Sequence, residues 1–194
     1  LNLLGTYRNG VFDVRTIQSV IPLFISAEYD MEHNRVQAQL KTEELHPTTI
    51  LSSSKDKKAF ARLKELVAHT DTSFSCDLST KELDYSSTGR FDIPNELFKG
   101  GVVLNYKVAG DENAVSVSRF SAKGANCSAD VNLELVFKTL QLSGLAEIPY
   151  FVLPNGNSVS TDIYFDPLDK GFMAFAPQLF LGQKSLTALQ LTFL

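Results

Sequence analysis

The sequence predicts a mainly β protein, an antiparallel β-sandwich of the jelly-roll or Greek-key kind with about 8–10 strands. Three observations support this fold class. Apolar and polar residues alternate through most of the chain, as in strands that have one solvent-exposed face and one buried face. Short polar links separate these segments, and links of this length join antiparallel neighbours. Only one long segment has the spacing of an amphipathic helix.

The first clear hairpin is predicted within residues 23–41. The polar link Asp30–Asn34 separates two runs in which every second residue is apolar. These apolar residues are Leu23, Ile25, Ala27 and Tyr29 in the first run, and Val36, Ala38 and Leu40 in the second. Residues 74–78 repeat the pattern, and residues 102–120 contain two further strands around a turn at Gly110–Asn113.

The most regular stripe runs from Cys127 to Phe137, where every second residue is apolar. After it, Asn155-Gly156 lies between two β-rich runs and gives the strongest hairpin signal in the chain. A further turn is predicted at Asp166–Asp169, with Gly171 placed for a positive φ. A last alternating run ends at Phe193.

One segment, residues 55–69, departs from the alternation. Phe60, Leu63, Leu66 and Val67 have helical spacing there, and Ser53 or Ser54 is placed as the N-cap. We expect one amphipathic helix that covers an outer face of the sandwich or an open end. The alternative architecture is a closed β-barrel with this helix as its cap. In both cases residues 1–194 are interpreted as a single β-rich domain, because we find no repeat or obvious linker.

Composition excludes some classes of function. The net charge of −4 and the pI of about 5.4 disfavour nucleic-acid binding. No apolar run approaches the roughly 20 residues of a membrane helix, so no transmembrane segment is expected. The first residue is Leu1 and not Met, which indicates a processed product or a fragment. A secreted, cell-envelope or particle-associated location is favoured over the cytoplasm.

The two cysteines, Cys76 and Cys127, are candidates for a disulfide because each shares a strand face with apolar neighbours. A bond that closes a loop of about 50 residues would stabilise the fold by roughly 4 kcal/mol. The alternative is two reduced cysteines that pack as small hydrophobic side chains. Neither cysteine has a histidine or basic residue near it in sequence, so a catalytic thiolate is not expected.

Acidic residues gather at one predicted turn, where Asp162, Asp166 and Asp169 form a candidate calcium site. Ordinary turn chemistry explains the same aspartates. His33, near Asp30 and Glu32, could also touch a cation or simply belong to a solvated turn. The chain has no HExxH, GxSxG, GxGxxG or phosphate-binding loop. We therefore expect no cofactor, and we favour a non-enzymatic function.

Aromatic residues are dense in two segments near the end of the chain. They are candidates for an interface or for the lining of a ligand cavity: Tyr150, Phe151, Phe172, Met173, Phe175 and Phe180. Around Met173 residues of both parities are apolar, which indicates a strand covered on both faces. The cover could be the predicted helix, a partner protein or a bound lipid-sized molecule.

Three functions follow from these features. The favoured one is a non-catalytic binding or structural protein that assembles through protein–protein association, with a protein partner or as a homo-oligomer. The first alternative is a β-barrel carrier of a small hydrophobic ligand. The second is a hydrolase whose acidic site is dispersed over distant loops.

Overall fold

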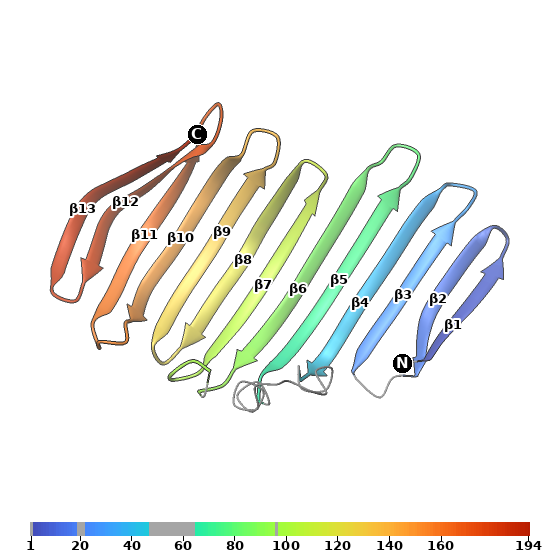
Figure 1. Ribbon diagram of the computed structural model, residues 1–194, viewed down its shortest axis with the longest axis horizontal. Helices are drawn as coiled ribbons and strands as arrows, with labels where there is room; N and C mark the ends of the chain where they lie inside the picture. Colours follow the sequence, from blue (N-terminus) through green and yellow to red (C-terminus); the bar gives the residue numbers. More distant parts are fainter. Residues whose placement is uncertain (1, 19–21, 47–64, 96) are drawn as a thin grey trace, which may run out of the picture. The chain divides into compact units, whose positions relative to one another are not determined.

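The computed structural model describes residues 2–18, 22–46, 65–95 and 97–194, and the regular secondary structure within them is all β. Within these residues thirteen antiparallel strands form one sheet, and their order in the sheet is their order in the sequence. The first and the last of the described strands do not pair, so the sheet is not closed. Figure 1 shows this succession of hairpins along the chain. The mainly β class and the antiparallel pairing are therefore confirmed.

The chain divides into two compact units. The first comprises Leu1–Asp92 and Ala109–Glu112, and the second comprises Ile93–Val108 and Asn113–Leu194. Strand β7 (Val102–Asp111) contributes to both. The interpretation of the chain as a single domain stays a prediction.

The first unit has a polar face and an apolar face. Its strands are β1 (Asn2–Arg8), β2 (Val11–Gln18), β3 (Leu23–Asp30), β4 (Arg35–Leu45), β5 (Val67–Asp77) and β6 (Leu83–Ile93). Residues opposite each other on antiparallel neighbours point to the same face. One row of opposed residues is polar and runs Ser26, Gln39, Ser73, Ser86. The next row is apolar and runs Ala27, Ala38, Phe74, Tyr85.

The second unit is built in the same way. After β7 its strands are β8 (Ala114–Gly124), β9 (Cys127–Val136), β10 (Gln141–Val152), β11 (Ser158–Pro167), β12 (Phe172–Leu181) and β13 (Lys184–Phe193). Val131 lies opposite Phe120 on β8 and Ala146 on β10, and Ala146 lies opposite Ile163 on β11. The stripe predicted from Cys127 onward is thus the apolar face of this unit.

Hydrogen bonds link neighbouring turns within each unit. The backbone N–H of Met31 donates to the carbonyl of Gly10 at 2.9 Å, and that of Leu78 donates to Asn34 at 2.9 Å. In the second unit Gly171 donates to Thr139, also at 2.9 Å. Gly171 has a φ of 79°, as its place in the predicted turn requires. These bonds extend the pairing of the strands into the turns.

The buried interior is small. Among the described residues the buried apolar side chains are Ala68, Val102, Cys127, Ala146 and Ala176. No described Phe or Leu side chain is buried, although large side chains normally supply most of a core. The described strands are therefore held mainly by backbone pairing and cross-strand contacts.

The predicted sandwich is not confirmed, because the described strands form one sheet and not two. The expected number of strands, about 8–10, was too low. The closed barrel is contradicted because the sheet is open. The physical reason is the connectivity. A Greek key needs a long connection that returns a strand beside the first, whereas each strand here pairs with its neighbour in sequence.

The helix predicted over residues 55–69 is wrong at its C-terminal end. Val67, Ala68 and His69 belong to β5, where they lie opposite Asp92, Phe91 and Arg90 of β6. The helical spacing of Leu63, Leu66 and Val67 was outweighed by this pairing, since strand contacts between segments override local propensity. Residues 55–64 lie outside the described residues.

Candidate functional site

A shallow pocket of about 400 Å³ lies on the polar face of the first unit, near the turn that joins β3 to β4. It is lined by Glu28, Asp30, His33, Arg35, Gln37 and Asp77. The strand register assembles it, because Arg35 lies opposite both Asp30 and Asp77. Glu28 and Gln37 form the next opposed pair. The period of two in both strands therefore places these polar groups on one face.

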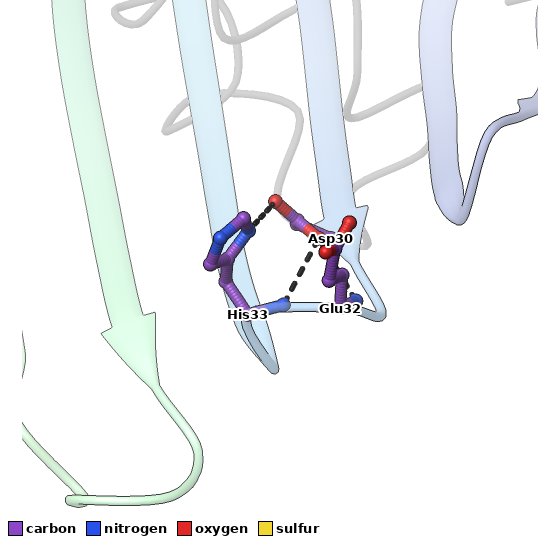
Figure 2. Close-up of polar contacts among 3 residues, drawn as sticks. All are labelled: Asp30, Glu32 and His33. Carbon is purple, nitrogen blue, oxygen red and sulfur yellow. Dashed lines mark hydrogen bonds and ion pairs between the residues drawn. The ribbon is translucent and has the colours of Figure 1, made fainter.

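Asp30 and His33 both line this pocket, and their side chains are joined by a polar contact (Figure 2). Oδ1 of Asp30 accepts hydrogen bonds from the backbone N–H of Glu32 at 2.9 Å and of His33 at 3.1 Å. Oδ2 of Asp30 lies 2.7 Å from Nδ1 of His33. These hydrogen bonds, first of all the one to the imidazole, lower the pKa of Asp30. The hydrogen bond with Asp30, aided by its charge, raises the pKa of His33.

Asp77 has the same role in the turn after β5. Its Oδ1 accepts from the backbone N–H of Ser79 at 2.8 Å and of Thr80 at 3.0 Å, and these bonds lower its pKa. Arg35 donates to the hydroxyl of Ser75 from Nε at 3.2 Å and from Nη2 at 3.1 Å. The pocket thus offers two ionised carboxylates that also hold turns. A carboxylate with a lowered pKa is a weak base, which makes it poorly suited to proton transfer near neutral pH.

The predicted metal ligands are not brought together. Asp162 lies opposite Glu147, Asp166 lies opposite Met173, and Asp169 lies in the turn after β11. Four residues along a strand separate Asp162 from Asp166 by about 13 Å, too far to share one ion. Within residues 2–18, 22–46, 65–95 and 97–194, no group of three or more His, Cys, Asp or Glu side chains could hold a metal ion.

The two cysteines have free thiols and lie in different units. Cys76 is half-buried on β5, opposite Val36 and Leu83. Cys127 is buried on β9, and burial raises the pKa of its thiol. Both positions agree with cysteine packed as a small hydrophobic side chain. The Cys76–Cys127 disulfide stays a prediction.

The six aromatic and Met candidates do not form one patch. Phe151 and Phe172 lie on the apolar face of the second unit, where Phe172 stacks on Phe193 with ring centroids 4.7 Å apart. The other four lie on the opposite face, each across from a residue of a neighbouring strand. These pairs are Tyr150 with Ser128, Met173 with Asp166, Phe175 with Tyr164, and Phe180 with Ser160. The high frequency of aromatic residues in these two segments therefore did not reveal on which face of the sheet each side chain lies.

Sequence reasoning missed Arg35, Gln37 and Asp77 as neighbours of His33. The signal was present in the chain, because the link Asp30–Asn34 fixes which residues of β3 and β4 are opposed. It also missed the hairpin of β1 and β2, although Asn9-Gly10 is a typical hairpin turn and both residues have positive φ.

Comparisons of the chain with protein-family models, with curated proteins and with solved structures gave no match. Within the part of the chain that the structure describes, no helix is both long and apolar enough to cross a membrane. The arguments for function therefore come from the two apolar faces and the pocket.

Proposed function

We propose that this protein is a non-catalytic binding or structural protein that works by protein–protein association through the apolar faces of its units. The observation that carries this proposal is the absence of any buried Phe or Leu side chain among the described residues. On the apolar face of the first unit, Phe12 is 45% exposed and Phe74 is 39% exposed. Contiguous apolar surface of this kind is typical of sites where proteins associate.

Other large side chains on the apolar face of the first unit support the same proposal. Tyr7, which lies opposite Phe12, is 65% exposed, and Leu3 is 51% exposed. Burial of apolar area is favourable, at about 25 cal/mol per Å² before the costs of association.

The chemistry of the pocket supports association over catalysis. Asp30 and Asp77 accept backbone hydrogen bonds that lower the pKa of both carboxyls. Their roles in the turns explain their presence without a substrate. The carrier and the dispersed-site hydrolase have no comparable observation in their favour.

Analytical ultracentrifugation over a concentration series tests the proposal, with Phe12→Asp as the disruptive variant. Phe12 lies opposite Tyr29 on the apolar face, and a carboxylate there should weaken association at least tenfold. Phe24→Asp is the matched control. Phe24 is similarly exposed, at 49%, but lies opposite Lys41 on the polar face. A monomeric wild type at high micromolar concentration, or equal effects of the two variants, would contradict the proposal.

A further inference from the structure

The face of the second unit that lies opposite its apolar face carries a row of apolar side chains across three strands. Leu145 on β10 lies opposite Tyr164 on β11, and Tyr164 lies opposite Phe175 on β12. Tyr164 is 42% exposed, and Leu145 and Phe175 are half-buried. We call these three side chains the apolar row. The described residues leave it partly open to solvent.

Carboxylates border the apolar row on both sides. On one side, two positions along the strands, Glu147 lies opposite both Asp130 and Asp162. On the other side, also two positions along, lie Glu134 of β9 and Asp166 of β11. Two positions along a strand span about 6.7 Å, so the two acidic borders are about 13 Å apart. An apolar surface with a polar rim is typical of sites where proteins bind.

The strands that carry these residues contain acidic residues but no basic ones. β9, β10, β11 and β12 include the five carboxylates of the borders and no Lys or Arg. Among the described residues, Asp130 alone of the five has an ion-pair partner, Lys123 at 3.9 Å. Glu147 lies between two further carboxylates, and like charges opposed in this way destabilise a sheet. Positive charge on a partner would offset this repulsion.

We propose that this face of the second unit binds a basic amphipathic α-helix of a partner protein. The helix lies across β9–β12, with its apolar stripe on the apolar row and its Lys and Arg side chains at the two acidic borders. The inference goes beyond the proposed function, because it concerns the other face of the unit and a different kind of partner.

The dimensions of a helix fit this face. A helix with its side chains is about 10–12 Å across, close to the separation of the acidic borders. Lys and Arg on both flanks of the apolar stripe can therefore reach the borders, since their long side chains extend over apolar surface. The four strands span about 14 Å, which corresponds to about ten helical residues. The negative charge of the borders disfavours nucleic acid and anionic membranes as partners.

Calorimetric titration with two synthetic helical peptides tests the chemistry of the partner. In the probe peptide Leu residues form one stripe and Lys residues cover both flanks. The matched control peptide has the same Leu stripe and has Glu in place of each Lys. The Lys peptide should bind, and the Glu peptide should bind at least about tenfold more weakly, because its charges repel those of the borders. Binding of the Lys peptide should weaken as the salt concentration rises.

Two variants of the protein locate the site. Glu147→Lys should weaken binding of the Lys peptide at least about tenfold, because it places a positive charge in the border. The midpoint of urea denaturation should not fall in this variant, since the new lysine lies opposite two aspartates. Glu44→Lys is the matched control. Glu44 is an exposed glutamate of β4 in the first unit, so this variant has the same net charge and should change binding less than about threefold.

Three results would overturn the proposal. They are no binding of the Lys peptide, equal binding of the two peptides, and equal effects of Glu147→Lys and Glu44→Lys. None of these measurements depends on self-association of the protein. Their failure would therefore leave the proposed function standing, and that function is decided separately by the effect of Phe12→Asp in the ultracentrifuge.

Discussion

Nδ1 of His33 lies 2.7 Å from Oδ2 of Asp30, across the turn between β3 and β4. The other oxygen of the same carboxylate holds two backbone N–H groups of that turn. One side chain thus fixes both the backbone and the imidazole, and each group changes the pKa of the other.

The first prediction concerns the pH dependence of this pair. The pKa of His33 is raised above its ordinary 6.5, so its stabilising contribution is complete below pH 6.5 and is lost as the pH rises through the raised value. The pKa of Asp30 is lowered below 3.8, so its contribution is present above pH 3.8 and is lost as the pH falls through the lowered value. The pair is therefore expected to stabilise the turn most between about pH 4 and 6.5.

NMR titration of the His33 ring checks this prediction. In Asp30→Asn the pKa of His33 should fall back toward 6.5, because the carboxylate of Asp30 supplies both the hydrogen bond and the nearby negative charge that raise this pKa. Glu32→Gln is the control, since the charge of Glu32 raises the pKa of His33 less than Asp30 does. A larger change in Glu32→Gln than in Asp30→Asn would show that the turn differs from the one described here.

The second prediction concerns the thiols. Cys76 is half-buried and Cys127 is buried with a raised pKa, so a thiol reagent should label Cys76 first in the folded protein. Both should react at similar rates in denaturant. Mass spectrometry of timed samples measures the order. Labelling of Cys127 before Cys76 would contradict the burial, and a peptide that contains both sulfurs in a bond would establish the predicted disulfide.

The third prediction concerns Gly144 in β10, which lies opposite Leu133 of β9. Its φ is 134°, and a Cβ there would clash with the carbonyl oxygen of Asn132. Gly144→Ala should therefore lower the free energy of unfolding by about 3 kcal/mol or more, measured by urea denaturation. Gly10→Ala is the control. Gly10 also has positive φ, 82°, but nothing lies within 4 Å of the added methyl, so a loss of only about 1 kcal/mol is expected. Equal losses of unfolding free energy in the two variants would show that the backbones of β9 and β10 leave room for a methyl group at position 144.

The fourth prediction concerns Asn126, between β8 and β9. Its side-chain amide donates to the carbonyl of Lys99 at 2.6 Å and so connects this turn to the segment before β7. Asn126→Ala should lower the free energy of unfolding by about 1 kcal/mol. Asn155→Ala is the control, because the side chain of Asn155 bonds within its own turn, where its Oδ1 accepts from the N–H of Asn157 at 3.0 Å. If Asn126→Ala lowered the free energy of unfolding less than Asn155→Ala does, Asn126 would not link its turn to the segment before β7.

Alternation and turn chemistry predicted the local structure well. The hairpin around Asp30–Asn34, the stripe from Cys127 and the turn at Asn155-Gly156 are all present. They were predictable because period-two patterning and short turns act within a few residues. His69 shows where such reasoning stops, because helical spacing before it suggested a helix although β6 pairs with this segment.

The layers could not be predicted in the same way. A stripe such as Val131 and Leu135 shows that a strand has an apolar face, but it does not show what covers that face. Both residues are half-buried on β9, in one sheet, where a second sheet was expected. The pocket was equally hard to foresee, since Asp77 joins His33 only through the register of three strands.

The succession of strands also determines how strand pairing can propagate along the chain during folding. Since each strand's partners are the strands before and after it in the chain, a hairpin needs only a short loop closure to form, and it then offers its edge to the next segment. Stability in an array whose units contact only their neighbours is approximately a sum of nearest-neighbour terms. We therefore expect a proteolytic nick in one turn to loosen the two strands that it joins, while the ladders farther along the array persist.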